Sequence, residues 1–148
     1  MTMTDNQPVI ARADRDRRQA DTHAWCVAAF GDHDARSIPQ RGLRLMEEAI
    51  ETAQACGCDP AMLHLLIDHV YARPVGGLRE ELGGLGVTVL ALAQAAGLSA
   101  DDAESREVER VRAKPLAHFA ERNAAKKAAG FHVSATGQAA GAKGDGGD

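Results

Sequence analysis

With 148 residues and a net charge of −4, the chain has the length of one domain with room for tails. Hydrophobic residues make up 45% of it but aromatic residues only 3%, which favours packed helices over strands. A pI near 5.8 argues against a general nucleic-acid binder, which would present a basic face, so no stable nucleic-acid partner is expected.

Neither secretion nor membrane insertion is indicated. The N-terminal arginines are not followed by an apolar segment that could act as a signal sequence. The longest apolar run, residues 85–96, is far shorter than the roughly 20 residues that a membrane span needs. The three cysteines, two of them in Cys56-Gly57-Cys58, form no disulfide framework. We interpret them as free thiols of a cytoplasmic protein, with Cys-x-Cys as two ligands of a soft metal as the alternative.

The N-terminal part is expected to be irregular at first and helical later. Residues 1–21 are polar and charged without helical periodicity, and are predicted to form a disordered arm. A short helix is predicted from about residue 22 to Phe30, and a loop follows over residues 32–39. Trp25 and Phe30 are predicted to anchor the core, with base stacking as the alternative for Trp25.

The central feature is a predicted helix over residues 40–55, ended by Gly57, in which apolar residues recur at spacings of three and four. It carries three glutamates within about one turn, Glu47, Glu48 and Glu51. Like charges at this spacing repel by a few tenths of a kcal/mol per pair. A divalent cation held by the carboxylates reverses that repulsion. A solvated acidic face is the alternative interpretation.

Further helices are predicted downstream. Asp59 caps a helix whose first residue is a proline and which Pro74 ends. A last helix is predicted from about residue 100 to 111, and Lys114-Pro115 is expected to kink or split it before a further helical piece over residues 116–129. Together these segments predict an all-α domain over residues 22–130, followed by a disordered Gly/Ala-rich tail over residues 131–148.

A long helix is predicted between these, over residues 78–96, and its second half is apolar nearly all round. We therefore expect it to be central and buried. Its first half contains Gly83, Gly84 and Gly86, which are unfavourable in a helix and suggest that another helix or a ligand approaches the backbone closely.

This helix also begins with two acids, Glu80 and Glu81. Antiparallel packing against the glutamate helix could bring the two acid groups together. A pocket made in this way has the chemistry of a divalent-metal site that binds phosphates.

The motif at residues 47–51, Glu-Glu-x-x-Glu, followed by Glu81-Leu-Gly-Gly, resembles the all-α nucleotide pyrophosphohydrolases of the MazG type. Their pattern is Glu-x-x-Glu, a gap, then Glu-x-x-Asp. A phage and bacterial MazG-like subgroup is similar over roughly residues 22–130. The similarity runs from His23-Ala-Trp to Phe30-Gly31, through Arg44-Leu-Met-Glu-Glu-Ala-Ile-Glu and Asp68-His-Val-Tyr-Ala-Arg-Pro-Val-Gly, to Glu81-Leu-Gly-Gly.

The resemblance implies a MazG-like bundle of four to five helices, completed by dimerisation, in a homodimer or homotetramer. It implies hydrolysis of an NTP or dNTP to monophosphate and pyrophosphate, in nucleotide-pool housekeeping, with Mg²⁺ or alternatively Mn²⁺. Carried over to this chain, the metal ligands are Glu48, Glu51 and Glu81. Glu47 acts as a further ligand or orients the attacking water, so the catalytic residues are Glu47 and Glu48. The substrate-binding residues are Arg41, Arg44, Arg122 and Lys126, for each of which a solvated surface charge is the alternative.

The chain departs from the family pattern in two ways. Gly84 replaces the aspartate of Glu-x-x-Asp, and the gap between Glu51 and Glu81 is slightly longer than usual. The candidates for a substitute carboxylate are Asp68, Glu80, Glu107 and Glu109. Two rival hypotheses are a non-catalytic helical dimer that binds a nucleotide or a protein, and a purely structural helical bundle. The preferred base and sugar are not indicated by the sequence.

Overall fold

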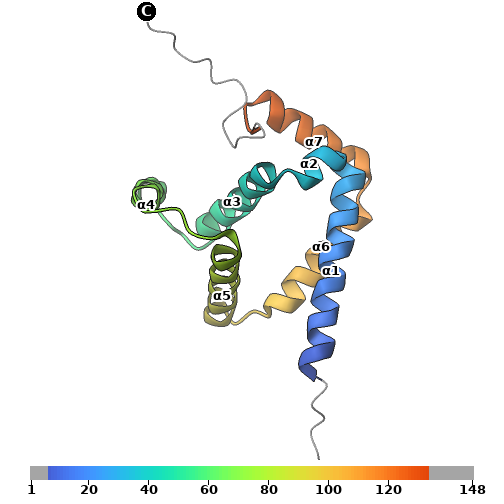
Figure 1. Cartoon of the computed structure of the whole chain (residues 1–148), viewed down its shortest axis with the longest axis horizontal. Helices are drawn as coiled ribbons and strands as arrows, with labels where there is room; N and C mark the ends of the chain where they lie inside the picture. The colour runs from blue at the N-terminus through green and yellow to red at the C-terminus, as the bar shows by residue number, and fades with distance from the viewer. Residues whose placement is uncertain (1–6, 134–148) are drawn as a thin grey trace, which may run out of the picture. The chain divides into compact units, whose positions relative to one another are not determined.

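The computed structural model describes residues 7–133, with side chains from residue 14 onward, and in this range the chain forms seven helices and no strand (Figure 1). The predicted all-α class is therefore confirmed. The predicted arm and tail lie partly outside the described residues. The helices are α1 Gln7–Phe30, α2 Asp32–Arg36, α3 Ile38–Ala55, α4 Pro60–Tyr71, α5 Leu78–Ala96, α6 Ala100–Ala113 and α7 Leu116–Ala128.

The chain divides into two units. The first unit comprises residues 1–45 and 107–148, and the second comprises residues 46–106. Helices α3 and α6 each continue from one unit into the other. The predicted single domain over residues 22–130 stays a prediction.

Helix α1 begins much earlier than predicted. The prediction of an irregular arm is wrong for residues 7–21, which form the first part of this helix. Good helix formers and charge pairs at helical spacing explain the difference, as in the ion pair of 2.6 Å between Arg17 Nη2 and Asp14 Oδ1. A helix stabilised in this way needs no apolar stripe, so its sequence shows no hydrophobic periodicity.

The prediction of a loop over residues 32–39 is also wrong. This segment contains helix α2 and the first turn of α3, joined at Ser37. Arg36 Nε lies 2.7 Å from Asp32 Oδ1, four residues earlier, and Ala35 is buried. A five-residue helix is too short to show an apolar period, and the tertiary packing of its two buried residues, Asp34 and Ala35, contributes to its stability.

The core of the first unit is an aromatic cluster. Helix α1 packs against α2 and α7, and the Trp25 ring centroid lies 5.4 Å from that of Phe30 and 4.9 Å from that of Phe119. Both pairs are edge-to-face, an arrangement that contributes about 0.5–1.5 kcal/mol beyond the area buried. Trp25 and Phe30 are half-buried and take part in the aromatic cluster, as predicted, and Phe119 is their buried partner from α7.

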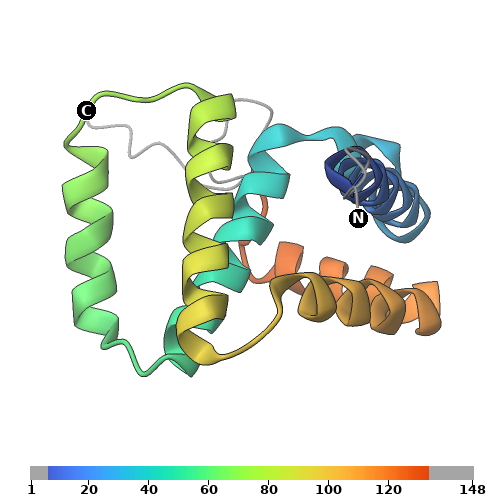
Figure 2. The same ribbon diagram turned by 90° about the horizontal axis from the view of Figure 1, so that it is seen from below.

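The helix boundaries in the second unit agree well with the prediction. Asp59 Oδ1 accepts a hydrogen bond of 2.9 Å from the Ala61 amide, and Pro60 is the first residue of α4. The bounds of α5 are those predicted, and the chain reverses direction between α4 and α5 (Figure 2). No single helix in the described part of the chain is long and apolar enough to cross a membrane, and only a bent pair, α5 with α6, passes by length and composition.

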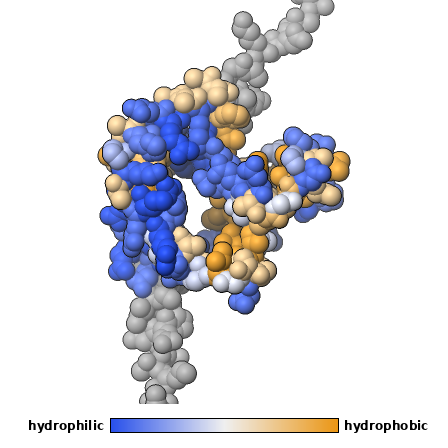
Figure 3. Space-filling model, turned by 180° about the vertical axis from the view of Figure 1, so that it is seen from behind, coloured by the Kyte–Doolittle hydropathy of each residue, from blue (hydrophilic) through white to orange (hydrophobic). Residues whose placement is uncertain are grey.

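The prediction that α5 is central and buried is wrong for this chain by itself. None of residues 46–106 is buried, and hydrophobic surface lies over α5 (Figure 3). A Cβ at Gly83, Gly84 or Gly86 would have no neighbour within 4 Å, so no described segment approaches the glycines. The large apolar side chains exposed on α4 and α5 include Met62, Leu65, Leu66, Val87, Val89 and Leu90. The apolar side chains of α4 and α5 therefore remain accessible to solvent in the described chain.

Candidate functional site

The three glutamates predicted to form the site lie together on α3. Glu48 and Glu51 are exposed and Glu47 is half-buried. Helix α3 ends at Ala55, and Gly57, two residues later, has a positive φ of 80° that suits a residue without a side chain. Both carboxylates of the Glu48/Glu51 pair are therefore available to solvent, one helical turn apart.

Glu81 occupies the beginning of α5, and its carboxylate is turned back toward the preceding loop. The Glu81 amide donates to the Gly77 carbonyl at 3.0 Å, and Oε1 occupies the space where a Cβ on residue 76 would stand. Gly77 caps the helix without a side chain. Acids in the first turn of a helix are stabilised by about 0.3–1 kcal/mol, and Glu80 shares this location.

The proposed metal ligands fit Mg²⁺ by donor type, because carboxylate oxygens are what this hard cation prefers. Their arrangement is incomplete, since the described residues include no group of three or more His, Cys, Asp or Glu side chains that could hold a metal ion. Glu48, Glu51 and Glu81 are thus not gathered into one ligand set within the described chain, and their joint role stays a prediction. The cysteines, likewise, are free thiols, with Cys56 and Cys58 exposed and Cys26 buried.

Among the candidates for a substitute carboxylate, Glu107 has another partner. Its carboxylate accepts a hydrogen bond of 2.6 Å from Arg110 Nε, and the hydrogen bonding by Arg110 lowers the pKa of Glu107. Both lie in the first unit, as does Glu109, whereas Asp68 and Glu80 lie in the second unit with the predicted ligands.

The four basic residues predicted to bind substrate all belong to the first unit. Arg41 is half-buried, with its guanidinium carbon 5.3 Å from the Phe30 ring centroid and Nη1 3.9 Å from Cys26 Sγ. Arg44 Nη2 donates to the Phe131 carbonyl at 2.6 Å. On α7, Arg122 is exposed and Lys126 is half-buried. Arg41 therefore contributes to packing against α1, and Arg44 is fixed at its outer end.

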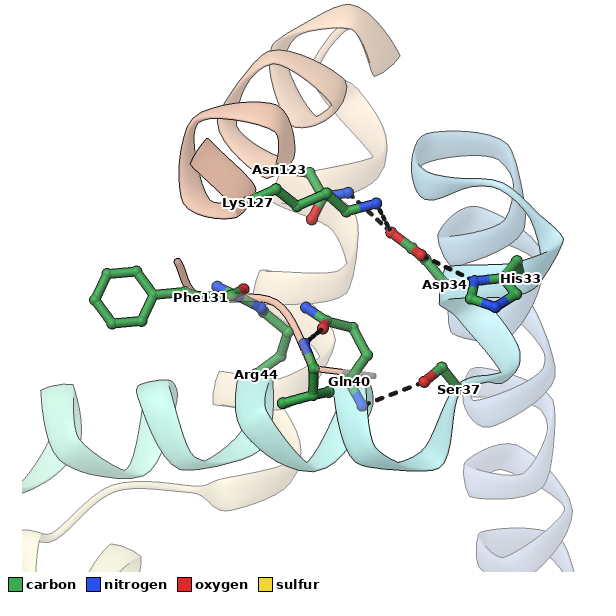
Figure 4. A network of polar contacts seen from close by, with 9 residues as sticks. His33, Asp34, Ser37, Gln40, Arg44, Asn123, Lys127 and Phe131 are labelled. Atoms are coloured by element: carbon green, nitrogen blue, oxygen red, sulfur yellow. Dashed lines mark hydrogen bonds and ion pairs between the residues drawn. The ribbon is translucent and has the colours of Figure 1, made fainter. Parts of the chain in front are cut away.

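Sequence reasoning missed a network centred on Asp34 (Figure 4). The side chain of Asp34 is only 5% exposed and accepts from Lys127 Nζ at 2.6 Å and Asn123 Nδ2 at 3.1 Å, with His33 Nδ1 at 3.3 Å. Burial raises the pKa of Asp34, but the hydrogen bonds from Lys127, Asn123 and His33 outweigh it and hold the pKa at about 2. The network joins α2 to α7.

Gln40, at the start of α3, was missed as well. It is completely buried, at 0% exposure, and its Oε1 accepts a hydrogen bond of 3.1 Å from the Val133 amide. The spacing of Asn123 and Lys127, four residues apart on one helix face, was the one available signal for a polar contact there. It does not identify Asp34, which lies 89 residues away along the chain in a segment predicted to be a loop.

Substituting Gly76 tests whether this position determines where the Glu81 carboxylate lies. In Gly76→Ala the new Cβ would overlap with Glu81 Oε1, and the flexible carboxylate should move at little cost in stability. We expect the NMR signal of the Glu81 carboxyl carbon to shift. Gly77→Ala is the matched control, because a Cβ there meets nothing within 4 Å. An unchanged Glu81 signal in Gly76→Ala would contradict this placement.

The predicted site residues thus fall into two sets: the acids in the second unit and the bases in the first. No protein-family model matches the chain, and no curated protein or solved structure matches it at a significant level.

Proposed function

We propose that the protein is a Mg²⁺-dependent nucleoside triphosphate pyrophosphohydrolase that converts an NTP or dNTP to monophosphate and pyrophosphate. The observation that carries the proposal is the exposed pair Glu48 and Glu51, one turn apart on α3. Two exposed carboxylates at this spacing suit a hard cation, which is bound through carboxylate and phosphate oxygens. The MazG-like sequence pattern gives the reaction, with a cytoplasmic housekeeping role in nucleotide pools.

Each residue has a definite task in this proposal. Arg41, Arg44, Arg122 and Lys126 would hold the triphosphate, and Glu48, Glu51 and Glu81 would hold Mg²⁺. A bound Mg²⁺ neutralises phosphate charge and lowers the pKa of a bound water. Glu47, half-buried beside the two exposed acids, would orient the attacking water and accept its proton. The product pair would be a nucleoside monophosphate and pyrophosphate.

The exposed apolar surface of the second unit supports assembly into a homodimer, or a homotetramer, that completes a MazG-like bundle. Covering apolar surface gains roughly 25 cal/mol for each Å² removed from water, and none of residues 46–106 is buried in the chain by itself. The open positions at Gly83, Gly84 and Gly86 would allow close helix approach.

We expect Leu90→Glu to convert the assembly to monomers in sedimentation velocity, because a charge at this exposed apolar position on α5 would have to be buried. Thr88→Glu is the matched control, since it places the same side chain at an exposed polar position of the same helix, two residues away and therefore on another face. A wild-type chain that sediments as a monomer at all concentrations would contradict the proposed assembly.

The proposed activity is tested by pyrophosphate release from a panel of normal and modified NTPs and dNTPs, with Mg²⁺ and with a chelator. We expect release from at least one nucleotide, only in the presence of the cation. A panel without any turnover would reject the proposal.

A second candidate is a non-catalytic helical dimer that binds a nucleotide or a protein. Gly84 favours it, because this residue supplies no carboxylate where the family pattern has aspartate, and the described residues gather no three-ligand group. Saturable nucleotide binding by calorimetry, without pyrophosphate release, would distinguish this candidate from the enzyme.

A further inference from the structure

Residues 130–133 form a short segment, here called the strap, that follows α7 and lies on α3. Gly130 has a φ of +89°, and its amide donates to the Lys127 carbonyl at 3.0 Å. The Phe131 amide donates to the Lys126 carbonyl at 2.9 Å, which completes the hydrogen-bond pattern of a glycine helix end. The strap therefore leaves α7 in a fixed direction. Residues 131–133 were predicted to belong to the disordered tail, and this prediction is wrong for them.

Two hydrogen bonds attach the strap to one face of α3 (Figure 4). The Phe131 carbonyl accepts from Arg44 Nη2 at 2.6 Å, and the Val133 amide donates to Gln40 Oε1 at 3.1 Å. Gln40 and Arg44 are four residues apart, so they follow one another on the same face of the helix. The strap thus joins a completely buried glutamine to a predicted phosphate-binding arginine.

The buried glutamine at position 40 makes one side-chain hydrogen bond and leaves its other polar group unpaired. Its Nε2 is buried without a hydrogen-bond partner, which is unfavourable because the amide group has lost its contact with water. His132 Nδ1, within the strap, is buried in the same way. An apolar side chain of similar length at position 40 would avoid the unpaired amide. What glutamine supplies, and an apolar residue could not, is the acceptor that holds Val133.

We propose that Gln40 is a positioning residue for substrate binding, and that it acts through the strap on Arg44. By holding Val133, Gln40 positions the Phe131 carbonyl, and this carbonyl holds the Nη2 end of the Arg44 guanidinium. A guanidinium in a fixed orientation presents its fork of N–H groups to a phosphate at lower entropic cost. The inference rests on the proposed function, in which Arg44 contacts the triphosphate.

Gln40→Met tests the inference, because methionine has a similar length but no comparable acceptor for the Val133 amide. We expect KM for the nucleotide to rise by about 10-fold, the size of one lost hydrogen bond to a charged group, while kcat is unchanged. The affinity for inorganic tripolyphosphate, measured by calorimetry, should fall by the same factor. The melting temperature should change little, since the unpaired Gln40 amide is removed while the half-buried Val133 N–H loses its acceptor.

A second variant breaks the same contact from the other side. Val133→Pro has no backbone N–H to donate to Gln40, and we expect the same rise in KM. The double variant should be no worse than either single variant, because both remove one interaction. Ser37→Ala is the control: Ser37 Oγ accepts from the Gln40 amide at 3.4 Å, so the change affects the start of α3 and leaves the strap in place.

NMR signals of the Arg44 guanidinium report on the strap independently of catalysis. Sharper guanidinium signals in Gln40→Met would report a more mobile Arg44 side chain. Together with weaker tripolyphosphate binding, they would support the inference. If the wild-type chain binds tripolyphosphate and Gln40→Met binds it equally well, the inference is overturned while the proposed function stands. If the wild-type chain neither binds nor hydrolyses a triphosphate, the inference is overturned together with the proposed function.

Discussion

Glu48→Gln and Glu51→Gln are each expected to lower kcat for pyrophosphate release by about 100-fold or more, because each removes a carboxylate from the proposed metal site. Both side chains are exposed. Substitution of exposed residues usually changes the free energy of unfolding by less than about 0.5 kcal/mol. The loss of activity should therefore occur in a folded protein, which circular dichroism and the melting temperature will verify.

Glu121→Gln is the matched control for these two variants. It makes the same chemical change at an exposed position on α7, outside the proposed site. We expect its kcat and KM to equal those of the wild type. Full activity in both Glu48→Gln and Glu51→Gln would exclude these residues as metal ligands, whatever the wild-type turnover.

Asp34→Ala is expected to lower the free energy of unfolding by about 3 kcal/mol, because it leaves Lys127 and Asn123 without their shared buried acceptor. The lower end of the usual range for a broken buried pair applies, since the Lys127 side chain is 37% exposed and regains some contact with water. Urea denaturation at neutral pH measures the change.

Asp32→Ala, on the same short helix, provides the comparison. Asp32 pairs with Arg36 at 2.7 Å, but both side chains are about two-thirds exposed, at 64% and 65%. Exposed pairs contribute about 0–1 kcal/mol, so we expect a loss well below that of Asp34→Ala. Equal losses in the two variants would show that the burial of the Asp34 network adds nothing to stability.

The Asp34 carboxylate also makes the free energy of unfolding depend on pH. The pKa of Asp34 is lowered from 3.8 to about 2 in the folded state, so folding favours the ionised form. This difference corresponds to about 2 kcal/mol. The contribution is present in full above the unfolded pKa and is lost as the pH falls from about 4 towards 2. Denaturation at pH 7, 4 and 3 should show this loss in the wild type and a smaller one in Asp34→Ala.

The sequence predicted the helix ends that are marked by a capping residue or a glycine. Asp59 followed by proline marks the start of α4, and Gly97 marks the end of α5, because a cap depends on residues close by in the chain. The N-terminal part of α1 has no apolar face, and α2 is too short for a period. Both were therefore missed, although charge pairs at helical spacing were present in each.

Contacts between residues far apart in the sequence could not be predicted from local patterns. The bond from Asn123 to Asp34 spans 89 residues, and that from Val133 to Gln40 spans 93, so no local pattern encodes either contact. The three acids of α3 were found because they lie within one turn. The prediction that Glu81 joins them rests on the family resemblance and on an expected antiparallel packing of α5 against α3. In the described residues these acids do not form a group that could hold a metal ion. The apolar pattern of α5 was read as burial within the chain, whereas its side chains remain exposed there.

The most direct test of the account is ³¹P NMR of a nucleoside triphosphate incubated with the wild-type protein, with and without Mg²⁺. Cleavage between the α and β phosphates predicts equal amounts of nucleoside monophosphate and pyrophosphate, formed only with the cation. Diphosphate with orthophosphate, or an unchanged spectrum for every nucleotide in the panel, would contradict the account.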